Sequence, residues 1–266
     1  MRKYLTVFTI SWQNEFTYRL NFILWRFRNV LRFLMTFFLW KGIFVTNKAV
    51  FGYSQPEMLT YVFLVLVVQS IVLSAPSADN IGGEISSGDL SNYLVKPVSY
   101  LKYWFTRDLS SKLLNIFFAV GEIGLLWLWL QPQIKLPSSV VVWLGFLGFC
   151  VVALGLYYFI NVASKFAAFW VPENTWGLTF VTLVLIEILG GSIFPLDVLP
   201  NWANSLIQFT PFPYLVYYPV AIFVGRINGV EMLRILMQAL AWLVAMFFVA
   251  KFVWRKGLMV YSSEGR

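Results

Sequence analysis

The stretch EMLTYVFLVLVVQSIVLSAPSA, residues 57–78, is apolar over most of its length and is followed at once by polar residues. A run of about 20 apolar residues matches the hydrocarbon core of a lipid bilayer. The rest of the chain has the same character, since 59% of its 266 residues are hydrophobic and only 12% are charged. Soluble domains carry roughly 25% charged residues. We therefore expect an all-α integral membrane protein.

Six stretches of this kind predict six transmembrane helices within one domain, residues 1–266. The predicted spans are residues 27–46, 57–78, 109–130, 138–164, 174–194 and 230–254. The domain then begins with an N-terminal segment (1–26), spans one and two (27–78) and a loop (79–108). Spans three to five (109–194) follow, and after them come an excursion (195–229), span six (230–254) and a tail (255–266).

The N-terminal segment 1–26 shows apolar residues three or four positions apart, which predicts one apolar stripe on a helix. The stripe consists of Leu5, Phe8, Trp12, Phe16, Leu20 and Ile23. Because Lys and Arg surround it, this amphipathic helix is typical of one that lies in the membrane interface. A stripe that packs against the protein's own helices gives the same pattern, and both interpretations stay open.

The segment 195–229 is apolar but rich in proline, and proline removes helical hydrogen bonds that lipid cannot replace. We expect short helices on the outer face there, dipping partway into the bilayer between spans five and six. Its marker residues are Phe194, Pro195, Leu199, Pro200, Pro211 and Pro213.

Lys and Arg residues gather in cytoplasmic loops of membrane proteins. With six spans and a cytoplasmic N-terminus, 15 of the 20 Lys and Arg residues fall on the inner side. This bias places both termini, and the loop 79–108, in the cytoplasm. It also accounts for the net charge of +8 without nucleic-acid binding.

The loop contains GGEISSGDLSNYLVKPVSY, residues 82–100. Leu90, Tyr93 and Leu94 are spaced to form an apolar knob on one face of a short helix. Pro97 ends that helix, and Ser99 can cap a helix that starts at Tyr100. The knob predicts a protein partner, although a solvated loop with no partner stays an alternative.

The inventory of side chains excludes several activities. The chain has no His, one cysteine (Cys150) and no metal-ligand spacing, so we expect no metal site and no His-based catalysis. A P-loop needs Gly-Lys followed by Ser or Thr, and no Gly-Lys dipeptide occurs. The chain is therefore not expected to be an enzyme, and any nucleotide hydrolysis belongs to another subunit.

Glu122 and Glu187 are the two acidic residues inside the predicted spans. A charge in hydrocarbon is costly and marks a functional site by default. One interpretation gives either acid a direct role in transport. In the other, each faces the bundle and pairs with a Ser, an Asn or an Arg of another helix.

The stretch 82–100 resembles the first cytoplasmic loop of ABC-2 type exporter permeases. The matching pattern is Glu84, Gly88, Asp89, Leu90, Tyr93, Leu94, Pro97, Val98 and Ser99. The family often has Arg after the Glu and Thr before the Pro, where this chain has Ile85 and Lys96. These departures indicate a divergent bacterial branch that includes daunorubicin-type permeases. Residues 190–220 are similar to the segment that follows the family's fifth helix.

The resemblance implies a permease subunit of an ATP-driven exporter in the bacterial inner membrane. It implies a separate cytoplasmic ATPase that binds ATP and Mg and touches Glu84, Gly88, Asp89, Leu90, Tyr93, Leu94, Lys96 and Pro97. It also implies a second permease, alike or different, and contacts with membrane lipids. The substrate is not identified: bands of Phe, Trp and Tyr near the outer ends of the spans suit an amphipathic or lipid-like one, and antibiotics, peptides, lipids and glycans all stay open. The rival hypotheses are an ion-coupled transporter that uses Glu122 or Glu187, and a membrane scaffold or enzyme without transport.

Overall fold

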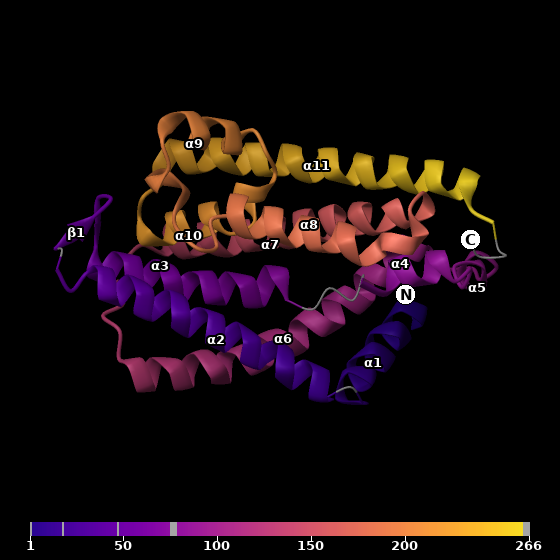
Figure 1. The fold of residues 1–266 in the computed structure, drawn as a ribbon, viewed down its shortest axis with the longest axis horizontal. Helices are drawn as coiled ribbons and strands as arrows, with labels where there is room; N and C mark the ends of the chain where they lie inside the picture. The colour runs from indigo at the N-terminus through magenta and orange to yellow at the C-terminus, as the bar shows by residue number, and fades with distance from the viewer. Residues whose placement is uncertain (1, 18, 47, 75–78, 263–266) are drawn as a thin grey trace.

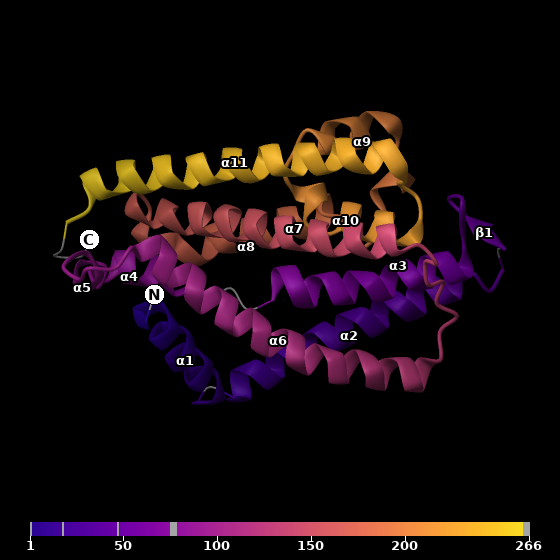
Figure 2. The same ribbon diagram turned by 180° about the vertical axis from the view of Figure 1, so that it is seen from behind.

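The computed structural model describes residues 2–17, 19–46, 48–74 and 79–262. Long helices lie side by side along the longest axis of the molecule, and short elements gather at its two ends (Figures 1 and 2). The long helices are α2 (Arg19–Ile43), α3 (Gln55–Val68), α6 (Tyr100–Leu130), α7 (Val140–Phe166), α8 (Thr175–Leu189) and α11 (Gly229–Val260). The remaining α-helices are α1 (Arg2–Thr17) and the short α4 (Asp79–Ser86), α5 (Ser91–Leu94), α9 (Asn201–Gln208) and α10 (Tyr217–Val224).

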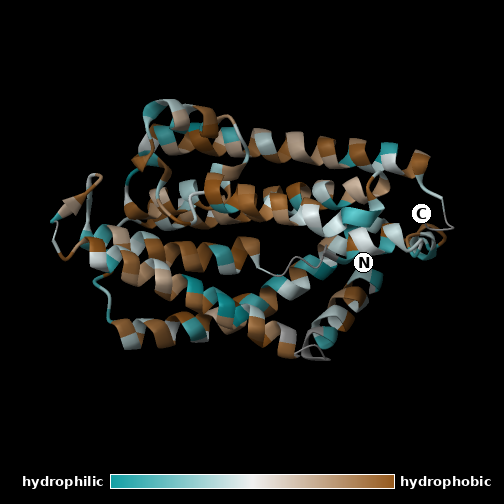
Figure 3. Cartoon of the chain, in the orientation of Figure 1, coloured by the Kyte–Doolittle hydropathy of each residue, from teal (hydrophilic) through white to brown (hydrophobic). Residues whose placement is uncertain are grey.

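Four helical stretches among the described residues are long and apolar enough to cross a membrane. They are Gln55–Leu73, Tyr100–Leu130, Val140–Phe169 and Gly229–Val260. The first combines α3 with a π-helix, η1 (Gln69–Leu73), and the third continues α7 through a 3-10 turn, η2 (Ala167–Phe169). Figure 3 shows these helices mostly in brown, the colour of hydrophobic residues, with teal and white segments around α4. The helical membrane class expected from composition agrees with this architecture.

The two other long-axis helices, α2 and α8, fall outside this set for different reasons. Helix α2 has 25 residues but carries Arg26, Arg28 and Arg32 within its length. Helix α8 is strongly apolar but has only 15 residues. Both nevertheless lie alongside the four long apolar helices (Figures 1 and 2).

The short elements define the two ends of the bundle. The start of α1, the helices α4 and α5, and the end of α11 lie together at what we call the α4–α5 end (Figure 1). The opposite, hairpin end carries β1 (Ala49–Val50), β2 (Tyr53–Ser54), α9 and α10. The hairpin is antiparallel, pairing Ala49 with Ser54 and Val50 with Tyr53. Its turn residues Phe51 and Gly52 have φ of 53° and 74°, the left-handed pair that a tight hairpin with matching twist requires.

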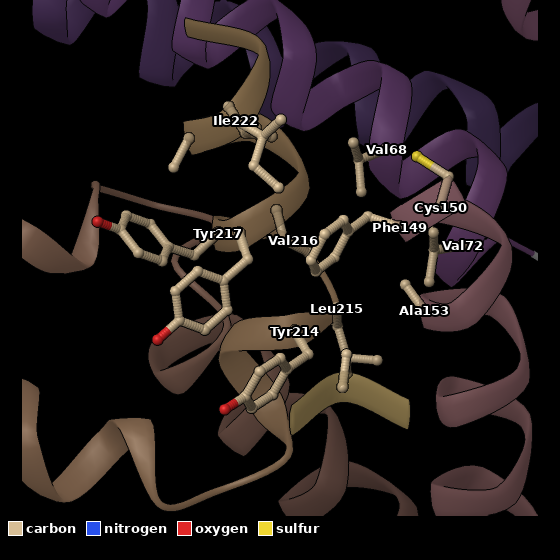
Figure 4. Close-up of a cluster of buried hydrophobic side chains, with 14 of the residues drawn as sticks. Val68, Val72, Phe149, Cys150, Ala153, Tyr214, Leu215, Val216, Tyr217 and Ile222 are labelled. Atoms are coloured by element: carbon tan, nitrogen blue, oxygen red, sulfur yellow. The ribbon is translucent and has the colours of Figure 1, made fainter. Parts of the chain in front are cut away.

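The largest apolar core surrounds α10. Val220, Ala221 and Ile222 are fully buried against α3 and α7. Figure 4 shows Val216 beside the Phe149 ring, with Leu215 and Ile222 in the same cluster. The preceding short elements are η4 (Leu196–Val198), α9 and the 3-10 turn η5 (Phe212–Tyr214). The proline-rich segment is thus divided into short helices, as its prolines predict, and α10 serves as core.

The helix boundaries differ from the predicted segment boundaries in three places. The amphipathic helix 1–26 is two helices, α1 and α2, so residues 19–26 belong to the first long helix. Helix α6 begins at Tyr100, nine positions before the predicted span, as the Pro97 and Ser99 signals indicate. Helix α11 continues to Val260, so residues 255–260 of the expected tail are helical. In the last two cases the helix continues beyond its apolar stretch, through polar residues that favour helix. Hydropathy predicts which residues lie in the bilayer, but it does not predict where a helix begins or ends.

Candidate functional site

The polar stretch 82–100 folds into two short helices at the α4–α5 end. Helix α4 ends at Ser86, and the chain turns at Gly88, whose φ of 84° suits glycine. The Leu90 amide donates to the Glu84 carbonyl at 2.9 Å, which closes the turn, and α5 follows. The chain then enters α6 through Ser99, which occupies the N-cap position, although its side chain makes no capping bond.

The inner side of these helices is anchored in an apolar cluster. Ile81, Ile85 and Leu90 are buried against residues of α6, α7 and η2. The Tyr100 and Trp254 rings stack with centroids 5.0 Å apart and an angle of 11° between their planes. The segment is therefore a packed part of the bundle.

Glu84 is the polar centre of this anchor. Its carboxylate accepts hydrogen bonds from the Tyr100 hydroxyl at 2.7 Å and the Tyr93 hydroxyl at 2.9 Å. Burial raises the pKa of Glu84 above its ordinary value, although the two hydroxyls and the charge of Arg107 act in the opposite direction. The carboxylate thereby ties α4, α5 and α6 together.

Tyr261, directly after α11, fixes the turn from the other side. Its hydroxyl donates to the Gly88 carbonyl at 2.6 Å and accepts from the Ser91 amide at 3.1 Å. These two bonds satisfy backbone groups of the turn. Sequence reasoning assigned Tyr261 to a tail, and no local signal links it to a turn more than 170 positions earlier.

The outer side of α5 exposes an apolar tip. Leu94 is 46% exposed and Val95 is 84% exposed, with Asp89, Lys96 and Pro97 exposed around them. The predicted knob of Leu90, Tyr93 and Leu94 is wrong in its exposure, since Leu90 is 0% exposed. Leu90 and Leu94 are one turn apart, but the Gly88 turn directs Leu90 into the cluster. The surface that can meet a partner is Leu94 with Val95, which we call the α5 tip.

Helix α1 lies against the same region. The Lys3 ammonium donates to the Pro97 carbonyl at 2.5 Å, and the Ser99 amide donates to the Tyr4 hydroxyl at 3.4 Å. The Ser110 hydroxyl of α6 donates to the Phe8 carbonyl at 3.0 Å. Leu5 is mostly exposed, whereas Phe8 is half-buried. The predicted stripe thus packs in part on the protein's own helices, and the side chain of Phe16 lies outside the described residues.

Both acids of the predicted spans pair with arginines of α2. Glu122 on α6 forms a salt bridge with Arg26, and Glu187 on α8 forms one with Arg32. The first pair is largely buried, and the second is about one-third exposed. This confirms the interpretation in which each acid pairs with an Arg of another helix. Together the pairs join α2 to α6 and to α8.

A buried lysine joins the two long helices that flank the α4–α5 segment. Lys112 on α6 is fully buried, and its ammonium donates to the Val72 and Ser74 carbonyls, each at 2.8 Å. These carbonyls lie at the end of η1, where a helix leaves carbonyl groups unpaired. Asp108, one turn earlier, lies 3.6 Å from the ammonium. Sequence reasoning counted Lys112 only as an inner positive charge.

The outer-segment residues do not form one surface. Pro195 and Pro213 are buried, Phe194, Leu199 and Pro211 are half-buried, and Pro200 is exposed. Asp197 in η4 accepts from the Tyr53 hydroxyl at 2.8 Å, and the Arg226 guanidinium lies 3.9 Å from the centroid of the Tyr53 ring. These contacts attach the outer segment to the hairpin. Among the described residues, no three His, Cys, Asp or Glu side chains gather as a metal site would require.

A bundle of long apolar helices with a packed polar segment at one end defines a multi-pass membrane protein. The sequence model of the protein family described as 'ABC-2 family transporter protein' matches residues 30–265. The chain therefore belongs to the ABC-2 transporter family. Members of this family are membrane permease components of ABC transporters, are not catalytic themselves, and in general work with an ATPase partner. No curated protein matches the chain.

Proposed function

We propose that this protein is the permease subunit of an ATP-driven exporter and that it receives the force of ATP hydrolysis at the α5 tip. The observation that carries the proposal is that the α4–α5 segment is anchored on its inner side and exposes apolar residues on its outer side. Glu84 and Tyr261 fix its base, while Leu94 and Val95 stay exposed on its outer side. Exposed apolar residues on a rigid base suit a partner that must push or pull without slipping.

We propose six spans, with α2 and α8 as the first and fifth. Both lie alongside the four long apolar helices, which supports the assignment (Figure 2). The arginines of α2 are compatible with a bilayer because Arg26 and Arg32 are paired with Glu122 and Glu187. The α4–α5 end, with both termini, then faces the cytoplasm of a bacterial cell, and the short helices around α10 lie on the outer side as a re-entrant segment.

The remaining parts of the assembly follow from the same proposal. A second permease, identical or different, completes the pathway, and the partner ATPase binds ATP and Mg. The arginine partners of Glu122 and Glu187 weigh against the ion-coupled alternative, because a carboxylate that cycles protons or sodium must be free to change partners. We also propose the divergent branch similar to daunorubicin-type permeases.

The test compares two exposed valines at opposite ends of the molecule. Val95 in the α5 tip is 84% exposed, and Val45, after α2, is 80% exposed. We expect Val95→Asp combined with Leu94→Asp to reduce co-purification of the ATPase at least about tenfold, which corresponds to a loss of about 1.4 kcal/mol or more of binding free energy. Val45→Asp should leave co-purification unchanged.

The folding of each variant is read from the size-exclusion profile and thermal midpoint in detergent, which should match the parent protein. Retention of the ATPase by a folded Leu94→Asp/Val95→Asp variant would refute docking at the α5 tip. Leu90→Asp is unsuited to this test because it would place a charge in the apolar cluster.

A further inference from the structure

The buried ammonium of Lys112 touches three of the four long apolar stretches. Lys112 lies on α6, and its ammonium donates to the Val72 and Ser74 carbonyls at the end of η1, each at 2.8 Å. The same ammonium lies 4.8 Å from the centre of the buried Tyr157 ring on α7. Taking a charge out of water costs free energy, and apolar side chains of similar volume are often at least as stabilising as a buried ion pair. Stability alone therefore does not account for a lysine at this position.

The side-chain contacts of the α4–α5 segment lead to α6 and not to η1. Glu84 accepts a hydrogen bond from Tyr100, and the apolar cluster around Ile81 and Ile85 includes residues of α6, α7, η2 and α11. Within the part of the chain that the structure describes, that cluster contains no residue of α3 or η1. The helix of η1 also ends at Ser74, whose backbone is extended, with φ of −68° and ψ of 146°. A displaced α4–α5 segment would therefore carry the inner end of α6 with it by direct packing.

Along its length, α6 makes apolar contacts at both ends and a directional polar contact between them. At the inner end Tyr100 and Trp104 are buried in the cluster of the α4–α5 segment, and at the outer end Leu126 is buried against α2 and α3. Apolar contacts are non-directional, so packed helices can slide on them by small amounts. The ammonium of Lys112 cannot slide without losing bonds to two carbonyls in a buried site, which is costly. The helix is therefore held in register with η1 at Lys112.

The end of η1 is itself fixed in the largest apolar core. Figure 4 shows Val72 near Cys150 and Ala153 of α7, and the same core includes Ala239 of α11. The carbonyls that hold Lys112 thus belong to a body formed by η1, α7 and α11.

We propose that Lys112 is a positioning residue of the transport cycle, which holds α6 to this body while the α4–α5 segment is displaced. Because α6 is held at that position, a movement of its inner end is passed on to its outer end. The inference rests on the proposed function, which supplies the force at the α5 tip. A lysine that only stabilised the fold would not affect the movement of the outer end.

The test measures nucleotide-dependent distances in the full-length permease bound to its ATPase, by pulsed electron spin resonance. An inner pair of labels is placed at two exposed positions, Lys102 of α6 and Met259 of α11. An outer pair is placed at Leu128 of α6 and Val230 of α11, which are also exposed. Cys150 is buried and stays unlabelled. Each distance is compared without nucleotide and with ATP, Mg and vanadate, and in the parent protein both should change.

The informative variant combines Lys112→Met with Asp108→Asn, because it removes both members of the buried charge pair and nearly keeps their volumes. Lys112→Met alone is unsuited, since it would leave Asp108 as an uncompensated buried charge. The double variant should keep the response of the inner pair and lose the response of the outer pair. Asp108→Asn alone, which keeps the lysine for the two carbonyls, should retain both responses. Lys135→Met, at a lysine whose side chain is 59% exposed, is the control for loss of a positive charge and should also retain both.

Folding of each variant is read from its size-exclusion profile and thermal midpoint. An outer pair that responds in the folded double variant as in the parent protein would overturn the inference. Loss of the inner response in the double variant, or loss of the outer response in Asp108→Asn, would overturn it as well. If neither pair responds in the parent protein with the ATPase retained, the proposed function itself fails, and that result is distinct from a failure confined to the double variant.

Discussion

The α4–α5 end and the hairpin end both consist of short helices between long ones, yet they use their apolar residues in opposite ways. Helix α10 at the hairpin end is buried along almost its whole length, including Val220, Ala221 and Ile222. Helix α5 has no buried residue, and Leu94 at its end and Val95 directly after it are exposed. An apolar residue that completes a core contributes to folding, whereas one on an anchored tip is free to contribute to binding.

The largest expected effect follows from placing the same charge at each end. Ile222→Asp puts a carboxylate into the α10 core, where nothing described pairs with it, and should cost several kcal/mol of unfolding free energy. Val95→Asp should leave stability within about 0.5 kcal/mol, as is usual for exposed positions. Thermal midpoints in detergent measure both. Equal thermal midpoints for Ile222→Asp and Val95→Asp would contradict the idea that apolar residues serve folding at the hairpin end and binding at the α4–α5 end.

The next effect concerns the anchor of the α4–α5 segment. Glu84→Ala removes the acceptor for two tyrosine hydroxyls and should destabilise the protein by about 1.5–3 kcal/mol, the range for hydrogen bonds to charged groups. Asp89→Ala, in the exposed part of the same segment, is the control and should change stability by less than about 0.5 kcal/mol. If both variants unfold at the same temperature, Glu84 is not an anchor.

The pH dependence of stability is a second test of Glu84 as the anchor of the α4–α5 segment. Because burial raises the pKa of Glu84 above 4.5 in the folded protein, the folded state binds more protons than the unfolded state just above that pH. Stability should therefore fall as pH rises from 4.5 through the folded pKa. The measured quantity is the difference in thermal midpoint between the parent protein and Glu84→Gln across this range. A difference that stays constant with pH would contradict the burial of Glu84.

The smallest effect is expected at Tyr261. Tyr261→Phe removes the bonds to Gly88 and Ser91 and should destabilise the turn by about 1 kcal/mol. Faster amide exchange in residues 86–94 measures this, because a local loss shows first as local opening. Tyr4→Phe, which loses one long bond to the Ser99 amide, should leave the same amides unchanged. Unchanged exchange in Tyr261→Phe would show that packing alone holds the turn.

Much of the architecture was predictable because hydrophobicity and proline act locally. Apolar runs indicated the membrane class and the positions of the long helices, and the prolines of 195–229 indicated short ones. The Pro97 and Ser99 signals predicted the start of α6 at Tyr100. The cost of a charge in hydrocarbon predicted partners for Glu122 and Glu187, although not which arginines they would be.

The candidate site was predictable only in part, because its environment is made by distant residues. Helical spacing placed Leu90 and Leu94 on one face, but Leu90 is covered by a cluster that includes Phe166 and Phe169. The partners of Glu84 and the role of Tyr261 depend on how α6 and α11 return to the same end. Spacing along the chain carries no information on contacts of that range.

The buried Lys112 attaches α6 to the end of η1 at one point along its length. This helix is continuous from Tyr100 to Leu130, about 46 Å along its axis at 1.5 Å per residue. The ammonium pins it to the end of η1 about 18 Å from its first residue and about 27 Å from its last. If the rod rocks about that pin, a displacement of 1 Å at Tyr100 becomes roughly 1.5 Å in the opposite direction at Leu130. On the proposed function, a small stroke at the α4–α5 end would be enlarged and reversed at the hairpin end.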